Sequence, residues 1–196
     1  MTEGSEMGAT GGMWGPVTAT IDWCEQNYVV CNYIAEFWNT ASAAAYIAAA
    51  GWGVYRHRKL PWWSLTPFLG LGMVGIGTGL FHTTLQYHSQ VLDELPMVYT
   101  EAILLGCFVS WPWQLAIATA CIVFSGIYLW TRSHILHQFV FGALLFAIVG
   151  LFWSRVRSIP RPSQPLAWRI LVLSAGLFLF GFFMWNIDNH FCAALT

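Results

Sequence analysis

Acidic and amide side chains gather in one short stretch near the N-terminus of this chain. Asp22, Glu25 and Asn27 lie within six residues of one another, and Glu36 follows inside an apolar segment. Carboxylate and amide oxygens are the ligands that Ca²⁺ and Mg²⁺ prefer. A helix cap at Asp22 followed by a solvated acidic loop is the simpler interpretation of the first three residues. Glu36 favours a bound ion or a buried partner, because a bare carboxylate among apolar residues is costly.

A hydroxyl, an imidazole and a carboxylate form a second group further along the chain. Thr78 and His82 are four residues apart and share one helix face, and Asp93 and Glu94 follow. A neutral histidine can bind Zn²⁺, and a hydroxyl can donate to a developing oxyanion. Asp93 could orient His82 or take a proton from a metal-bound water. The same residues also fit a core histidine paired with a carboxylate, and ordinary acids in the first turn of a helix.

The remaining polar residues of the apolar segments carry a weaker signal. His134 and His137 are three residues apart at the start of an apolar segment, a pattern that is more often structural than metal-binding. Glu101 is a buried acid without an evident partner. Gln86 and Gln90 give no specific signal. None of these residues alone predicts a site.

Membrane helices are the elements that must position these groups. Of the 196 residues, 57% are hydrophobic and 9% charged, whereas a soluble domain carries about a quarter charged residues. A membrane-spanning helix needs about 20 apolar residues. We therefore predict an all-α, polytopic membrane helix bundle with six spans, at about 33–55, 62–84, 95–112, 113–130, 135–153 and 167–187. A tight turn is expected at Trp111-Pro112-Trp113.

The basic residues predict the orientation of these spans. All but Arg132 fall on one side, and cytosolic loops are rich in lysine and arginine: the seven are Arg56, Arg58, Lys59, Arg155, Arg157, Arg161 and Arg169. Residues 1–32 are then a non-cytosolic segment and residues 33–196 form one bundle. The segment before the first span lacks the features of a cleaved signal peptide. The net charge of −1 argues against a nucleic-acid partner.

This topology brings the chemically active side chains to the N-terminal face. The loop predicted at 85–95 carries Asp93, and the end of the sixth span carries Asp188 and His190. Both meet the acidic stretch at 22–27 on this face. Ionisable groups within a membrane usually mark function. We therefore expect one site at the non-cytosolic end of the bundle.

Several motifs resemble those of the alkaline ceramidases, which are seven-helix membrane amidases of the endoplasmic reticulum and Golgi. The similarity runs from about Trp14 to Cys192. The stretches that carry it are Trp14-Gly15-Pro16, Asp22-Trp23-Cys24-Glu25-Gln26-Asn27-Tyr28, Tyr33-Ile34-Ala35-Glu36-Phe37-Trp38-Asn39-Thr40, Phe81-His82-Thr83-Thr84-Leu85, Leu92-Asp93-Glu94-Leu95-Pro96-Met97, His137-Gln138 and Trp185-Asn186-Ile187-Asp188-Asn189.

The resemblance implies a metal-dependent hydrolase. Zinc-dependent cleavage of the ceramide amide to sphingosine and a fatty acid is the implied reaction. His82 would be one of three zinc-binding histidines, Asp93 the catalytic aspartate, and Thr78 would replace a serine that is common in the family. A structural Ca²⁺ is implied as well, held by Asp22, Glu25, Asn27, Glu36 and the backbone carbonyl of Trp23. The location implied is the endoplasmic reticulum or Golgi membrane, with a lumenal N-terminus.

One family feature is missing from this sequence. The other two zinc histidines of the family come from an H-x-x-x-H pair on a seventh helix, and this chain contains no such pair. We expect a C-terminally truncated product; the alternative is that His137 or His190 substitutes for the missing ligands. The alternative function is a non-catalytic lipid-binding or regulatory membrane protein derived from a ceramidase.

Overall fold

The computed structural model describes residues 12–191, apart from the side chains of residues 189 and 190, and its regular elements are helical. This confirms the all-α class. In chain order the elements are α1 (Phe37–His57), the 3₁₀ turn η1 (Trp62–Leu65), α2 (Thr66–Thr84), α3 (Tyr87–Gly106), α4 (Trp111–Thr131), α5 (His134–Val156), the 3₁₀ turn η2 (Arg161–Ser163) and α6 (Gln164–His190).

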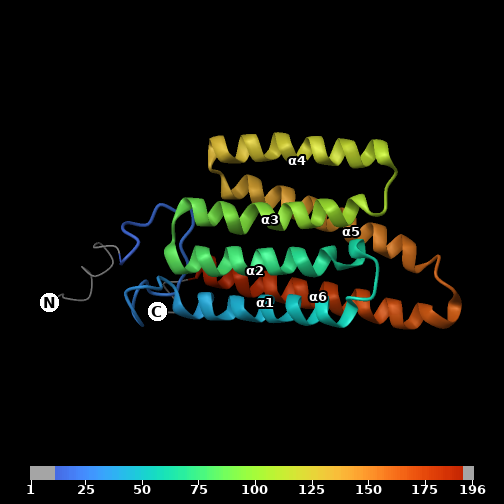
Figure 1. Ribbon diagram of the computed structural model, residues 1–196, viewed down its shortest axis with the longest axis horizontal. Coiled ribbons are helices and arrows are strands. Elements are labelled where there is room, and N and C mark those ends of the chain that lie inside the picture. Colours follow the sequence, from blue (N-terminus) through green and yellow to red (C-terminus); the bar gives the residue numbers. More distant parts are fainter. Residues whose placement is uncertain (1–11, 192–196) are drawn as a thin grey trace.

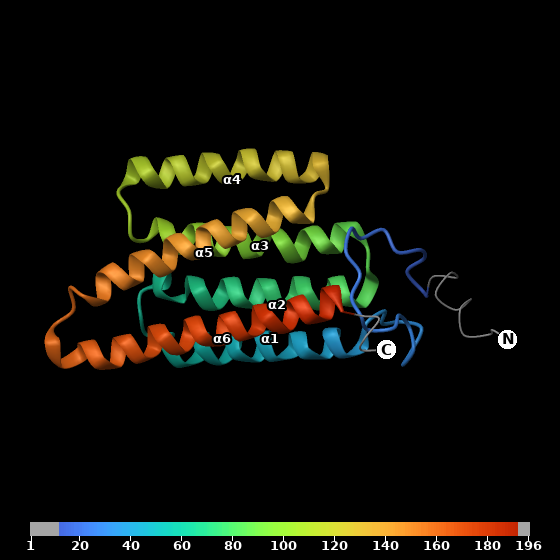
Figure 2. The same cartoon turned by 180° about the vertical axis from the view of Figure 1, so that it is seen from behind.

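The long helices run roughly side by side (Figure 1). Helix α2 packs between α1 and α3, and α3 also contacts α4 and α5. Helix α6 packs against α5 and η2, and Figure 2 shows both helices on the reverse side of the bundle. The residues before α1, the α2–α3 turn and the α4–α5 turn all lie at the same end of the molecule. This is the end at which the sequence places the polar residues.

Four helical segments are long and apolar enough to cross a membrane: Trp62–Thr84, Trp111–Thr131, His134–Val156 and Arg161–Asp188. They match the second, fourth, fifth and sixth predicted spans. Helices α1 and α3 carry more polar residues and fall outside this group. Six spans therefore stay a prediction, while several membrane-spanning helices are supported directly by length and composition.

The predicted boundaries of the third span are wrong. The apolar pattern predicts this span at 95–112, after a loop at 85–95, whereas α3 begins at Tyr87 and ends at Gly106. The turn lies at 107–110, and Pro112 stands in the first turn of α4. Proline is well tolerated there, because the N–H that it lacks has no partner inside a helix. Asp93 consequently lies in the second turn of α3 and is not a first-turn acid.

A close approach between α2 and α3 depends on one glycine and one proline. Pro96 lies inside α3 and has no N–H to donate to the carbonyl of Leu92, four residues earlier. Gly77 of α2 packs against this carbonyl: a Cβ atom on residue 77 would lie 2.1 Å from the oxygen of Leu92 and 2.8 Å from Cα of Asp93. The missing side chain thus lets α2 lie directly against the turn of α3 that carries Asp93.

Candidate active site at the end of helices α2 and α3

The segment before α1 is attached to the C-terminal end of α2. The last carbonyls of a helix lack partners within the helix. Here the N–H of Ala35 donates to Thr83 at 3.0 Å, and the N–H of Glu36 donates to His82 at 2.9 Å. Leu85 ends α2 in the left-handed conformation, with φ of 48°. Its carbonyl accepts hydrogen bonds from residues 18 and 19. The end of α2 therefore fixes the path of the preceding segment.

Apolar contacts strengthen this attachment. Ala35, Phe81 and Leu85 form a buried cluster, and Tyr28 packs against it. The hydroxyl of Tyr28 is buried without a hydrogen-bond partner. Burial raises the pKa of Tyr28, so the phenol stays neutral and serves as a packing group. The loop 22–28 is thus held against α2 by its backbone and by its side chains.

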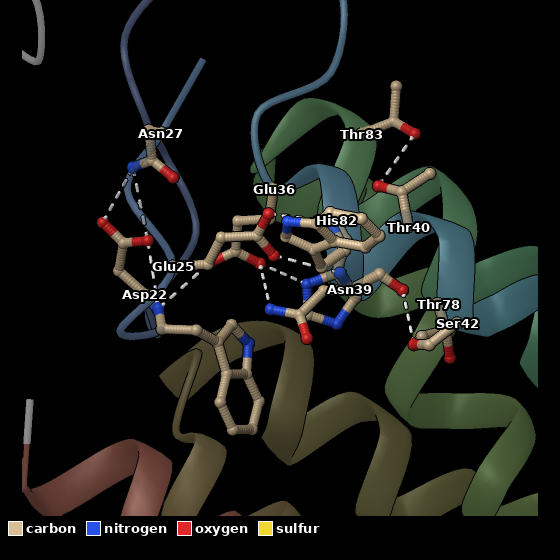
Figure 3. A network of polar contacts seen from close by, with 12 residues as sticks. Asp22, Glu25, Asn27, Glu36, Asn39, Thr40, Ser42, Thr78, His82 and Thr83 are labelled. Atoms are coloured by element: carbon tan, nitrogen blue, oxygen red, sulfur yellow. Dashed lines mark hydrogen bonds and ion pairs between the residues drawn. The ribbon is translucent and has the colours of Figure 1, made fainter. Parts of the chain in front are cut away.

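Glu36 and His82 are in direct contact at the centre of this region. One oxygen of the Glu36 carboxylate contacts Nδ1 of His82, and the other accepts a hydrogen bond from the N–H of Trp23 at 3.2 Å. Glu36 is fully buried and His82 is 7% exposed. Figure 3 shows Glu36 between Asp22 and Asn27 on one side and His82 on the other. A carboxylate on Nδ1 leaves Nε2 of His82 as the nitrogen available to a ligand, as in carboxylate–histidine–zinc arrangements.

Glu25 has the capping role that the sequence pattern predicts for Asp22. No helix begins at Asp22, so the predicted cap there is wrong. The two carboxylate oxygens of Glu25 instead accept hydrogen bonds from the N–H groups of Trp38 at 2.7 Å and Asn39 at 3.0 Å, in the first turn of α1. A carboxylate at this position is stabilised by the exposed N–H groups and the dipole of the helix.

The predicted calcium ligands are neighbours, but they do not form a preformed cage. Asn27 donates from Nδ2 to Asp22 at 3.2 Å, while Oδ1 of Asn27 is buried without a partner. A buried amide oxygen without a donor fits a cation ligand. Within residues 12–191, however, no group of three or more His, Cys, Asp or Glu side chains is arranged as a metal cluster. The calcium assignment stays a prediction that the donor chemistry supports.

Thr78 and Asp93 are joined across the α2–α3 contact. The hydroxyl of Thr78 donates to Oδ1 of Asp93 at 2.5 Å. His82 lies one helical turn beyond Thr78 on α2. The predicted grouping of these three residues at one end of the bundle is therefore consistent with the structure. Glu36, and not Asp93, is the carboxylate that contacts Nδ1 of His82 and orients the ring.

Aromatic rings lie over the site from two directions. The ring of Trp23 lies 5.9 Å from that of His82, centroid to centroid, and 5.5 Å from that of Trp185 on α6. The end of α6 therefore reaches the loop that carries the predicted calcium ligands. The side chain of His190, a proposed substitute ligand, lies outside the described residues.

His137, the other proposed substitute, is engaged elsewhere. Its Nδ1 lies 3.6 Å from a carboxylate oxygen of Glu94, and both residues are buried between α3 and α5. This arrangement supports the structural role for His137. Among the described residues, His82 is then the single histidine at the Thr78–Asp93 site. A catalytic zinc site needs three protein ligands, so the described residues supply only part of one.

Comparison with known proteins identifies the family. The sequence pattern of the family described as Ceramidase matches residues 15–196. Alkaline ceramidase 3 of Mus musculus is 36% identical over 197 residues, which cover 94% of this chain and 72% of the mouse protein. The chain belongs to the ceramidase family. An alkaline ceramidase of Saccharomyces cerevisiae is also 36% identical, over 93% of this chain and 65% of the yeast protein.

Membership of the ceramidase family confirms the resemblance found in the sequence motifs and places the chain among membrane amide hydrolases. An alkaline ceramidase of Drosophila melanogaster is 25% identical over 91% of this chain. The similarity therefore includes both the loop 22–27 and the α2–α3 contact. It reaches relatives in a mammal, a yeast and an insect.

The sequence pattern does not predict that Gln90 and Glu94 of this ceramidase region pair with each other. Gln90 and Glu94 are fully or almost fully buried, and Nε2 of Gln90 donates to Oε1 of Glu94 at 2.8 Å. They stand four residues apart on α3, a spacing that places both on one helix face. The apolar pattern places residues 85–95 in a loop, where spacing carries no information on side-chain direction, and this wrong boundary hides the pairing.

Proposed function

We propose that this chain is a ceramidase-type membrane hydrolase that cleaves the amide bond of ceramide to sphingosine and a fatty acid. The names of its relatives and the pattern of the family support this substrate class. The observation that carries the proposal is the contact of the buried Glu36 carboxylate with His82, one helical turn from the Thr78–Asp93 pair. A carboxylate near an oriented imidazole and a hydroxyl can act as a general base, and the hydroxyl can stabilise an oxyanion, as amide hydrolysis would use them.

The chain's own side chains have distinct roles in this proposal. Asp93 accepts the proton of the attacking water, since its carboxylate lies at the α2–α3 contact near His82. Thr78 now donates its hydroxyl to Asp93. When the substrate carbonyl develops negative charge, this hydroxyl turns to donate to the oxygen. Glu36 holds His82 so that Nε2 remains free for a ligand.

Two metals are part of the proposal. Zinc bound at Nε2 of His82 would lower the pKa of a bound water and polarise the carbonyl, with its other ligands supplied from outside the described residues. Calcium would be held by Asp22, Glu25, Asn27, Glu36 and the carbonyl of Trp23, and would fix the loop beside His82. The unpartnered Oδ1 of Asn27 supports this second site.

The proposed topology has six membrane spans with the site at the non-cytosolic end. The connections α1–α2 and α5–α6 lie at the opposite end of the bundle (Figure 1). They carry four of the eight basic residues: Arg58, Lys59, Arg157 and Arg161. Arg56 and Arg155 lie in the last turns of the helices that lead into these connections, and Arg169 follows shortly after the second one. A cytosolic position of this end agrees with the distribution of basic residues in membrane proteins. The site would then face the lumen of the endoplasmic reticulum or Golgi, where it meets a lipid substrate from the bilayer.

One observation favours the second candidate function, a non-catalytic lipid-binding protein. An apolar groove of about 750 Å³ lies between α4 and α5, and its lining contains neither His82 nor Asp93. Such a groove could hold an acyl chain without any hydrolysis. The two functions differ in the fate of the bound lipid.

Product analysis separates the two functions. The purified full chain, supplied with zinc and calcium in detergent micelles, is incubated with ceramide, and free sphingosine is measured. We expect release by the wild type, and a loss of about 10²- to 10⁴-fold in Asp93→Asn. His82→Ala is measured in the same assay. Its matched control is His88→Ala, because His88 lies on the exposed surface of α3. Intact ceramide that binds equally to the wild type and Asp93→Asn would favour the non-catalytic function.

A further inference from the structure

A fully buried glutamine joins the loop segment to the helix that carries Asp93. Gln90 of α3 is 0% exposed. Its Oε1 accepts a hydrogen bond from the N–H of Thr20 at 2.8 Å, and its Nε2 donates to Oγ1 of Thr20 at 2.7 Å. The amide and Thr20 thus form a reciprocal pair. A glutamine side chain has few ways to satisfy both of its ends in a buried position, so this geometry specifies one position of residue 20.

The same amide reaches a second partner within α3. Nε2 of Gln90 also donates to Oε1 of Glu94 at 2.8 Å, and the other oxygen of Glu94 lies 3.6 Å from Nδ1 of His137. A continuous set of polar contacts therefore runs from residue 20 through α3 to α5. Glu94 is the residue directly after Asp93. Thr20 stands two residues before Asp22, the first predicted calcium ligand.

Neighbouring contacts fix the segment before Thr20, and Gln90 binds the residue at which this segment leads into the loop. Thr18 and Ala19 are held by the carbonyl of Leu85, and the hydroxyl of Thr18 accepts a hydrogen bond from the N–H of Tyr87 at 2.9 Å. After Thr20, the next backbone anchor outside the loop is the hydrogen bond from the N–H of Trp23 to Glu36. Gln90 therefore holds the last point of the segment before the chain enters the loop 22–27.

We propose that Gln90 is a positioning residue that holds the loop 22–27 in register with the turn of α3 carrying Asp93. The calcium part of this inference rests on the proposed function: a loop held in place binds the ion more tightly than a loop that must first be ordered. The hydrogen bonds of the Gln90 side chain go to Thr20 and Glu94, which are neither proposed metal ligands nor proposed reacting groups. Its effect passes through Thr20 on one side and through Glu94 on the other.

Hydrogen exchange in the presence of a chelator tests the positioning without any metal. The purified full chain is compared with Gln90→Leu, and the informative amides are those of Trp23 and Tyr28, which are hydrogen-bonded to Glu36 and Ala35 and do not touch Gln90. We expect faster exchange at both amides in Gln90→Leu. Gln114→Leu is the control, because that glutamine also makes hydrogen bonds through its side-chain amide, to the carbonyls of Gly106 and Val109, but lies at the other end of the bundle.

Variants of Thr20 distinguish the loss of the Gln90–Thr20 hydrogen bonds from misfolding of Gln90→Leu. Thr20→Val should reproduce the faster exchange, whereas Thr20→Ser, which keeps the hydroxyl, should retain wild-type exchange. The double variant Gln90→Leu/Thr20→Val should exchange no faster than Gln90→Leu alone, because both changes break one reciprocal pair. Unchanged exchange at Trp23 and Tyr28, or an increase spread evenly over all helices, would overturn the proposal.

A calcium titration then separates this inference from the proposed function. With thermal unfolding as the readout, the calcium midpoint should rise by about 10- to 100-fold in Gln90→Leu, as for other residues that support metal ligands, and should stay unchanged in Thr20→Ser. A midpoint unchanged in Gln90→Leu would overturn the effect on calcium. If calcium stabilises none of the proteins, the proposed calcium site fails, while faster exchange in Gln90→Leu would still support positioning by Gln90.

Discussion

The carboxylate of Glu36 contacts the imidazole of His82, which lies 46 residues further along the chain. This contact joins the residue expected to bind calcium to the residue expected to bind zinc. It arises because the N–H groups of Ala35 and Glu36 donate to the carbonyls of Thr83 and His82 in the last turn of α2. The termination of one helix therefore places the side chain that orients the key histidine.

Removal of the Glu36 carboxylate should destabilise the protein through His82. We expect Glu36→Ala to lower the free energy of unfolding by about 2 kcal/mol, the range for a buried hydrogen bond to a charged group. Thermal unfolding in detergent measures the change. Addition of His82→Ala should then cost less than it does alone, because the two residues are partners. Fully additive losses would show that the contact is not energetically significant.

Glu25 should stabilise the first turn of α1 whether or not calcium binds. Glu25→Ala removes both acceptors for the first turn of the helix, and we expect a loss of about 1 kcal/mol. Hydrogen exchange at the amides of Trp38 and Asn39 should accelerate in the presence of a chelator. Asp22→Ala is the matched control, because Asp22 caps no helix. Equal effects of the two changes at Trp38 would contradict the cap.

Gly77→Ala should separate α2 from α3. The added methyl group would lie 2.1 Å from the carbonyl oxygen of Leu92, and relief of such a clash by a backbone shift costs about 1–3 kcal/mol. Gly79→Ala meets its nearest neighbour at 3.7 Å and should be tolerated. Thermal unfolding of both variants gives the comparison. Equal melting temperatures would show that the close approach is absent.

Thr78 should act through its hydroxyl. In the ceramide assay, Thr78→Val should lose about 10²- to 10³-fold in kcat, the usual effect of removing one oxyanion donor. Thr78→Ser keeps the hydroxyl and should stay near the wild-type rate. The pair of variants separates the chemical role of the side chain from its volume. A wild-type rate in Thr78→Val would exclude the proposed role.

Much of the architecture could be predicted from hydropathy. Four predicted spans match helical segments of sufficient length and apolar character, because a membrane helix must satisfy its backbone internally and face lipid with apolar side chains. The boundaries of α3 could not be predicted in this way. Its first turns carry polar residues that are buried by partners on other segments, so the apolar stretch begins well after Tyr87, where the helix begins.

The polar contacts of the site were predicted only as a neighbourhood. The predicted topology places Asp22, His82 and Asp93 at one end of the bundle, with Glu36 just inside the first span. The partner of each side chain, however, depends on contacts between distant parts of the chain. Gln90 shows this most clearly, since its partner Thr20 lies 70 residues away in the sequence. Local spacing carries no information about such a pair.

The most direct test of the proposed hydrolytic centre is the zinc content of the purified full chain, measured by elemental analysis beside His82→Ala and His88→Ala. We predict zinc bound to the wild type and to His88→Ala, and lost from His82→Ala. Zinc that is retained equally in His82→Ala, or a wild type that releases sphingosine without zinc, would contradict the placement of the metal centre at His82.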